Sequence, residues 1–119
     1  MDYPERKTLD DKAMFDDIVQ GILSAMGDDA VKIILYGSVA RGDNTWESDV
    51  DIAVLSKRHY SWKDREKIYD VTAPLGLEYN TLFSVRVIEQ NYFNDWKYDM
   101  PFFYNISEEG ITLWTRNAA

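Results

Sequence analysis

The stretch Leu35-Tyr36-Gly37-Ser38, followed after residues 39–48 by Asp49-Val50-Asp51-Ile52, decides the fold of this chain. The apolar run from Val31 to Tyr36 predicts a buried strand, and Asp49 to Leu55 predicts a second one. The short connection between them suits an antiparallel pair. In such a pair the end of the first strand lies beside the start of the second. The Gly-Ser turn and the two acids are therefore expected on one edge of the sheet.

The Gly-Ser turn has the properties of a phosphate-binding segment. Gly37 lacks a side chain, so backbone N–H groups near it can approach an anion closely. Ser38 adds a hydroxyl donor, and a helix beginning there would offer free N–H groups and a favourable dipole. A Gly-Ser dipeptide also occurs in plain turns, so the turn by itself does not specify phosphate binding.

The two acids that follow the turn favour a functional site over a plain turn. Asp49 and Asp51 are two residues apart on an expected strand and point to the same face, while Val50, Ile52 and Val54 occupy the other. Two neighbouring carboxylates repel each other and lose hydration unless a cation sits between them. Mg²⁺ suits such oxygen ligands together with substrate phosphates. The alternative is a strand that begins at the sheet rim with both acids in water. The adjacent turn favours a metal-nucleotide site.

The rest of the chain predicts helices around a small sheet. The order helix, strand, turn, strand, helix, strand, helix indicates an α+β (mixed α/β) fold, with a mixed sheet of at least three strands and helices packed against it. The expected third strand runs parallel to the second. The other expected elements are a helix over 8–27, a helix over 61–73 ended by Pro74 and Gly76, a strand over 81–88, a short helix or loop over 90–100, a helix over 101–109 and an extended segment over 111–114.

Length and composition set limits on the protein class. The 119 residues predict one domain, 1–119, in which residues 1–7 form a loose leader. The net charge of −8 disfavours direct binding to nucleic acid or to anionic membranes. Cysteine is absent, which excludes disulfides. The charged N-terminus lacks a signal core, and no apolar run is long enough for a membrane span, so we expect a soluble cytoplasmic protein.

The segment from Tyr36 through Ile52 resembles the defining motif of the DNA polymerase β-like nucleotidyltransferase superfamily. The fuller stretch Gly37-Ser38-Val39-Ala40-Arg41-Gly42-Asp43 is similar to the minimal nucleotidyltransferase (MNT) domains, its small bacterial branch. The resemblance implies the polymerase β-like fold and transfer of AMP from ATP with Mg²⁺. It also implies a kinship with MNT antitoxins encoded beside HEPN toxins, some of which modify a toxin tyrosine.

The resemblance also implies roles for individual residues. Gly37 and Ser38 would hold the triphosphate, and Asp49 and Asp51 would ligate the metals. Two metal ions can align such a displacement and neutralise its charge without a covalent protein intermediate. Arg41, one turn past Ser38, is within reach of phosphate, although a solvent-facing arginine fits its position equally well. The single histidine, in the charged segment 57–60, is expected on the surface.

A third carboxylate is the uncertain part of the expected site. Active members of the superfamily carry it on the next strand, facing the first two. In a parallel third strand it would lie near the beginning, where Glu78 is the only acid at an alternating position. We therefore group Glu78 with the two aspartates as catalytic. Asn80 is a neutral near-isostere of aspartate, Ser84 could contact a metal only through water, and Glu89 lies towards the far end.

Three functions follow from these observations. The first is a nucleotidyltransferase that moves AMP from Mg-ATP to a hydroxyl acceptor, most plausibly a tyrosine of a partner HEPN toxin. The second is a catalytically weak or inactive nucleotide-binding antitoxin that neutralises its partner by occlusion. A small-molecule nucleotidyltransferase is less favoured, because no second domain is present to enclose the substrate. The aromatic residues of segment 90–100 are the expected surface for a partner or for self-association.

Overall fold

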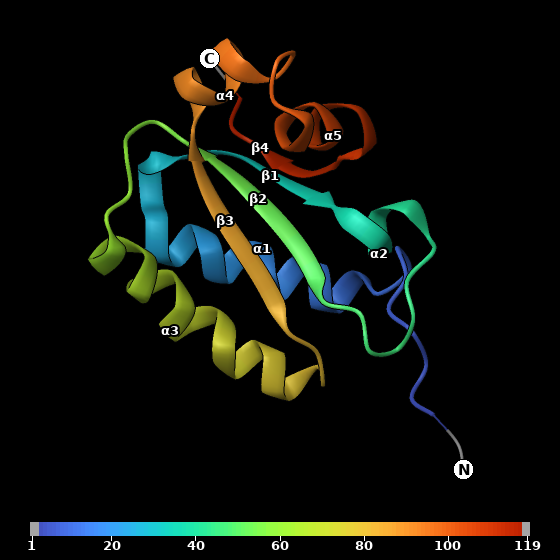
Figure 1. The fold of residues 1–119 in the computed structure, drawn as a ribbon. Helices are drawn as coiled ribbons and strands as arrows, with labels where there is room; N and C mark the ends of the chain where they lie inside the picture. Colours follow the sequence, from blue (N-terminus) through green and yellow to red (C-terminus); the bar gives the residue numbers. More distant parts are fainter. Residues whose placement is uncertain (1–2, 118–119) are drawn as a thin grey trace.

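The strand from Val50 to Ser56 is buried along nearly its whole length, so both of its faces must be covered. The computed structural model describes residues 3–117 and places a four-stranded sheet between two layers of helices (Figure 1). The elements are α1 (Lys12–Met26), a 3₁₀ turn (Gly27–Asp29), β1 (Ala30–Tyr36), α2 (Gly37–Arg41), β2 (Val50–Ser56), α3 (Trp62–Glu78), β3 (Phe83–Glu89), α4 (Gln90–Trp96), α5 (Pro101–Glu109) and β4 (Ile111–Thr115).

The sheet is mixed, with strand order β3-β2-β1-β4. β1 and β2 are antiparallel, with Tyr36 opposite Asp51, and β2 and β3 are parallel, with Asp51 opposite Ser84. The α+β fold with a small mixed sheet is therefore confirmed, including both expected pairings. β4 pairs antiparallel with β1, so the expected extended segment is an edge strand.

Each face of the sheet has its own apolar core. On one face, α1 and α3 pack over Val50, Ile52 and Val54 of β2. On the other face, α4 and α5 pack over Ala53 and Leu55. Because side chains alternate along a strand, Asp51 lies on the α4–α5 face, at the end where that core stops. Within residues 3–117, no helix combines the length and the apolar character needed to cross a bilayer.

The third helix is longer than its sequence predicts. α3 continues past Pro74 to Glu78, although proline removes a helical hydrogen bond and usually ends a helix. Its last turn is held by the segment that follows, where the Thr81 N–H donates to the Gly76 carbonyl. A Cβ on Gly76 would lie 2.7 Å from the Thr81 carbonyl oxygen, so the close packing needs glycine. Tertiary packing overrides the local signal here.

Arg6 and Lys7, at the end of the N-terminal segment, contact the loop between α2 and β2. Arg6 donates to Asn44 Oδ1 (3.2 Å), and Asn44 Nδ2 donates to the carbonyl of Lys7 (2.8 Å). Asn44 is buried in the loop between α2 and β2, and a buried amide needs such partners. The hydrogen bonds of Asn44 thus connect residues 6–7 to the loop between α2 and β2. Residues 1–2 lie outside the described part of the chain.

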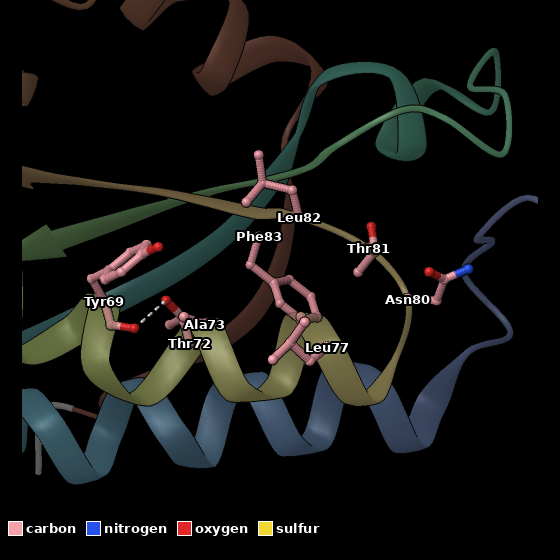
Figure 2. A pocket seen from close by; sticks show the side chains of 9 residues that line it. Tyr69, Thr72, Ala73, Leu77, Asn80, Thr81, Leu82 and Phe83 are labelled. Atoms are coloured by element: carbon pink, nitrogen blue, oxygen red, sulfur yellow. Dashed lines mark hydrogen bonds between the residues drawn. The ribbon is translucent and has the colours of Figure 1, made fainter.

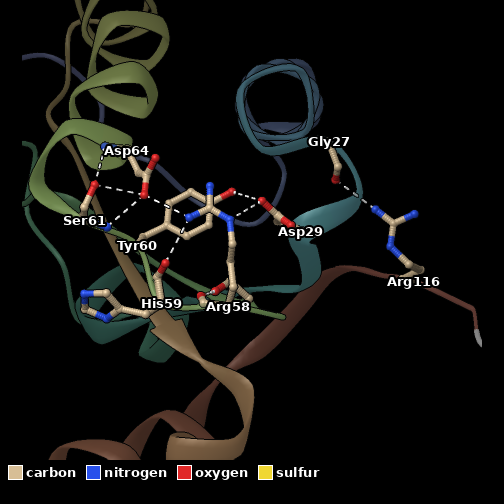
Figure 3. A network of polar contacts seen from close by, with 9 residues as sticks. Gly27, Asp29, Arg58, His59, Tyr60, Ser61, Asp64 and Arg116 are labelled. Carbon is tan, nitrogen blue, oxygen red and sulfur yellow. Dashed lines mark hydrogen bonds and ion pairs between the residues drawn. The ribbon is translucent and has the colours of Figure 1, made fainter.

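A polar network fixes the connection from β2 to α3 at the end of the sheet away from Asp51 (Figure 3). Arg58 donates to Asp29 Oδ2 and to Asp64 Oδ2, each at 2.9 Å, and its guanidinium lies 4.3 Å from the centroid of the Tyr60 ring. The hydrogen bond from Arg58 holds the pKa of Asp64 below its usual range. His59 is exposed, as expected, and contributes only its backbone carbonyl to this network.

Candidate functional site

The Gly-Ser turn and the acid pair meet at one edge of the sheet. β1 ends at Tyr36, opposite Asp51, and Gly37 follows with φ of +77°. A Cβ on Gly37 would lie 2.4 Å from Asp51 Oδ2. Glycine is needed here both for the left-handed backbone and for the space that the carboxylate occupies. The structure thus brings together the two features that the sequence placed on a common edge.

The charge of the acid pair is not balanced by a close ion pair. Asp49 lies just before β2 and is exposed, and Asp51 is half-buried. Burial, and then repulsion from Asp49, raise the pKa of Asp51, against smaller opposing effects of Arg86 and Arg41. Among residues 3–117, no basic group lies within ion-pairing distance of either aspartate. A divalent cation between them would relieve both the repulsion and the cost of burial.

The short helix α2 presents its first turn to this edge. It contains five residues, and the N–H groups of a first helical turn have no partners within the helix. Ser38 is half-buried here. Arg41, at the other end of α2, donates to Asp43 Oδ2 (3.1 Å) and to Glu109 Oε2 (3.3 Å). The exposed guanidinium of Arg41 is thus occupied by two carboxylates.

The candidates for a third acid occupy three different places. Glu78 is the last residue of α3, in the helical layer on the opposite face from Asp51, so the structure does not bring it to the acid pair. The longer α3 explains this, because it ends where an extended segment was expected. Asn80 lies in the following turn with φ of +52°. Ser84 is the candidate that stands opposite Asp51, on β3.

The carboxylate set at this edge therefore has two members. Glu89 stands opposite Ser56 at the far end of the sheet, as expected for a poor candidate. Within residues 3–117, no three histidine, cysteine, aspartate or glutamate side chains gather closely enough to hold a metal by themselves. Two carboxylates still suit Mg²⁺, which usually completes its ligands with substrate phosphates and water. Asp49 and Asp51 fit this pattern.

Sequence reasoning missed a basic and two aromatic side chains beside Asp51. The rings of Tyr36 and Phe102 pack edge to face with centroids 5.6 Å apart, and the Arg86 guanidinium lies 5.2 Å from the Phe102 centroid. Burial and the charge of Asp51 raise the pKa of Tyr36, while the charge of Arg86 lowers it. Arg86 follows Ser84 by two residues, so the alternation along β3 could have placed it on this face.

A separate pocket lies between α3 and the start of β3 (Figure 2). Its volume is about 460 Å³, and Tyr69, Leu77 and Phe83 are among the residues that line it. Phe83 belongs to the core beneath α1 and α3, so the pocket opens on the face opposite to Asp51. Among residues 3–117, no acidic or basic side chain lines it. The pocket is therefore distinct from the edge where the charged groups meet.

The fold and this edge define the class of protein. The family model described as "Polymerase beta, Nucleotidyltransferase" matches residues 20–119. The chain belongs to this family.

Two proteins are similar to this chain in sequence. The chain is 36% identical over 83 residues to "Putative protein adenylyltransferase MJ0604" of Methanocaldococcus jannaschii, covering 70% of this chain and 77% of the relative. A second protein of that organism, MJ0141, has the same description and is 38% identical over 63 residues, covering 53% of this chain and 64% of the relative.

Solved structures share the fold at low identity. A toxin-antitoxin crystal structure with AMP-PNP has a TM-score of 0.61 at 18% identity, covering 86% of this chain and 73% of that chain. A tri-AMPylated Shewanella oneidensis HEPN toxin in complex with MNT antitoxin has a TM-score of 0.58 at 15% identity, covering 88% and 72%. The structural neighbours of this chain thus include antitoxins of HEPN/MNT pairs.

Gly37→Ala should destabilise the protein more than Gly42→Ala. Both glycines have positive φ, so each substitution carries a backbone cost of about 1–2 kcal/mol. Only the Gly37 methyl group would also collide with Asp51, since nothing lies within 4 Å of a Cβ on Gly42. Urea unfolding of both variants measures the difference. Equal losses would contradict the close contact between Gly37 and Asp51.

Asp51→Asn should raise the free energy of unfolding at pH 7 in the presence of EDTA. The raised pKa of Asp51 means that the folded chain keeps this proton to a higher pH than the unfolded chain. The contribution of Asp51 to stability therefore falls as the pH rises from about 3.8 through the folded-state pKa. The increase in the free energy of unfolding caused by Asp51→Asn should disappear at pH values below this range, where Asp51 is protonated in both states. Unfolding curves against pH, with Asp70→Asn as the exposed control, measure it.

Proposed function

We propose that this protein transfers AMP from Mg-ATP to a tyrosine hydroxyl group of a HEPN-type partner toxin, and so acts as an antitoxin. The observation that carries the proposal is the contact between Gly37 and Asp51, which joins a phosphate-binding turn to a pair of metal ligands. The relatives named as protein adenylyltransferases and the toxin-antitoxin neighbours support the same assignment. We expect the protein to act in the cytoplasm, where ATP is available.

The residues at the edge fit a magnesium-bound nucleotide. Asp49 and Asp51 would hold Mg²⁺, and the N–H groups of Gly37 and Ser38, with the Ser38 hydroxyl, would bind the phosphates. When bound, Mg²⁺ neutralises the charge that develops on the transferred phosphoryl group and on the leaving pyrophosphate. The buried side of β2 keeps Val50 and Ile52 in the core, so the carboxylates are presented by a rigid strand.

The transfer balances without a covalent protein intermediate. The acceptor oxygen forms a bond to the α-phosphorus of ATP, and the bond from that phosphorus to the oxygen leading to the β-phosphate breaks. Pyrophosphate leaves, and the proton of the acceptor hydroxyl is released. Because Asp49 and Asp51 would hold the metal, this proton would pass to solvent water.

The α4–α5 surface beside the acid pair suits a protein acceptor. Phe93 and Phe103 are buried in the core beneath these helices, whereas other aromatic side chains of the same region are exposed. Those exposed side chains are Tyr92, Trp96, Tyr98, Phe102 and Tyr104. Phe102 contacts Tyr36, which lies opposite Asp51, so a partner docked on this surface would lie next to the transfer site. Self-association through it stays a prediction.

The two-membered carboxylate set favours a second candidate function. A chain in which Ser84 rather than an acid stands opposite Asp51 could bind Mg-ATP and occlude its partner with little or no transfer. The two functions differ in the fate of the α-phosphate. Only the first leaves labelled AMP on the partner.

Asp49→Asn and Asp51→Asn should each abolish labelling of a HEPN protein from the neighbouring reading frame by ATP labelled at the α-phosphate. Each substitution removes a metal ligand without changing side-chain volume, so the fold should persist. Incubation with the labelled ATP and Mg²⁺, followed by electrophoresis, measures the transfer. Asp70→Asn is the control for a lost surface carboxylate.

Unchanged labelling by either variant would end the proposal for transfer. If the wild-type chain neutralises the toxin without labelling it, and the two variants neutralise it equally well, the occlusion function is correct. Replacing the modified tyrosine of the toxin with phenylalanine identifies the acceptor.

Ser84→Asp should strengthen binding of a divalent cation by about tenfold and raise the rate of transfer. The new carboxylate would stand opposite Asp51 and complete a set of three. Calorimetric titration with Mn²⁺ measures the affinity. Ser107→Asp, an exposed change of the same charge on α5, is the matched control. Equal affinities for the two variants would show that Ser84 does not face the metal.

A further inference from the structure

Arg86 is a cation that the fold places on the same face of the sheet as the acid pair. It lies on β3, two residues after Ser84, and Ser84 stands opposite Asp51. Side chains at alternate strand positions share a face, so Arg86 and Asp51 both lie on the α4–α5 side of the sheet. The Arg86 side chain is exposed to solvent.

The Arg86 guanidinium contacts one aromatic ring, which packs against a second. Its guanidinium lies 5.2 Å from the centroid of Phe102, a distance typical of a cation–π contact. Phe102 in turn packs edge to face against Tyr36, the residue opposite Asp51. The ring contacts thus link the guanidinium to Tyr36, the strand neighbour of Asp51, and the charge of Arg86 acts on both Tyr36 and Asp51.

Arg86 also differs from Arg41 in having no carboxylate partner within residues 3–117. Within residues 3–117, no acidic group lies within 4.0 Å of its nitrogen atoms. Arg41, the other basic residue whose charge acts on Asp51, is occupied by Asp43 and Glu109. Within residues 3–117, no carboxylate therefore competes with a phosphate for Arg86.

We propose that Arg86 binds a phosphate group of the nucleotide, so that the site consists of two carboxylates for the cation and one guanidinium for the phosphates. The proposal rests on the proposed function, because it assigns a ligand contact within the same site. A triphosphate beside Asp49 and Asp51 accumulates more negative charge than one divalent cation balances. A planar guanidinium can donate two parallel hydrogen bonds to phosphate oxygens and neutralise part of this charge.

The test compares nucleotide binding with cation binding in the same variants. Calorimetric titration with Mg²⁺ and AMP-PNP measures the first, and titration with Mn²⁺ alone measures the second. Arg86→Gln should weaken AMP-PNP binding by about tenfold or more, the range of a lost charge-assisted hydrogen bond. It should not weaken Mn²⁺ binding, because it removes a positive charge from the neighbourhood of Asp51.

Two further variants separate charge, geometry and position. Arg86→Lys keeps the charge but loses the paired donors, so its affinity for AMP-PNP should fall between those of the wild type and Arg86→Gln. Lys67→Gln removes one positive charge from the exposed surface of α3 and should bind AMP-PNP as the wild type does. Thermal unfolding of each variant establishes that the fold is retained.

The outcomes separate this proposal from the function on which it rests. If the wild type and Arg86→Gln bind Mg·AMP-PNP equally, the role of Arg86 is wrong and the nucleotide site stands. If Arg86→Gln loses Mn²⁺ binding to the same extent as nucleotide binding, the residue supports the structure of the site rather than the phosphate. If the wild type binds no Mg·AMP-PNP, the proposed function fails, and this assignment fails with it.

Discussion

The site depends on one close approach, between the backbone of Gly37 and the carboxylate of Asp51. Antiparallel pairing of β1 and β2 sets Tyr36 opposite Asp51, and the left-handed turn at Gly37 brings α2 over the same edge. Any side chain at Gly37 would occupy the position of the Asp51 oxygen. The buried residues of β2 fix the strand from the other face, so the carboxylate is supported by the core of the molecule rather than by a loop.

The two neighbouring carboxylates lower the stability of the fold but favour the binding of a cation. Asp51 is half-buried beside Asp49, and the folded chain keeps this repulsion because no basic group within residues 3–117 pairs closely with either acid. Such a loss of stability is common at sites whose side chains are arranged to bind a ligand. The contact of Arg86 with Phe102 places a cation near the two acids but outside ion-pairing distance of them.

Local patterns were enough to predict the sheet and the central features of the site. The apolar runs around Tyr36 and Asp51 gave the strands, and alternation gave the face of the acids. What failed depended on packing between distant segments. Nothing local in the chain shows that α3 passes through Pro74, and that extension is what removes Glu78 from the edge. Alternation along β3 could have placed Arg86 on the face of the acids, but its distance from Asp51 along the sheet depends on the register of β3 against β2, which a sequence does not specify.

The contact of the N-terminal segment with the loop before β2 has a practical consequence for handling this protein. Arg6 and Lys7 hydrogen-bond to Asn44, and the same loop continues into Asp49. An affinity tag fused ahead of Tyr3 is therefore attached to the approach to the acid pair, not to a remote tail. Purification handles belong at the other end, beyond β4, where the chain leaves the sheet at the edge strand.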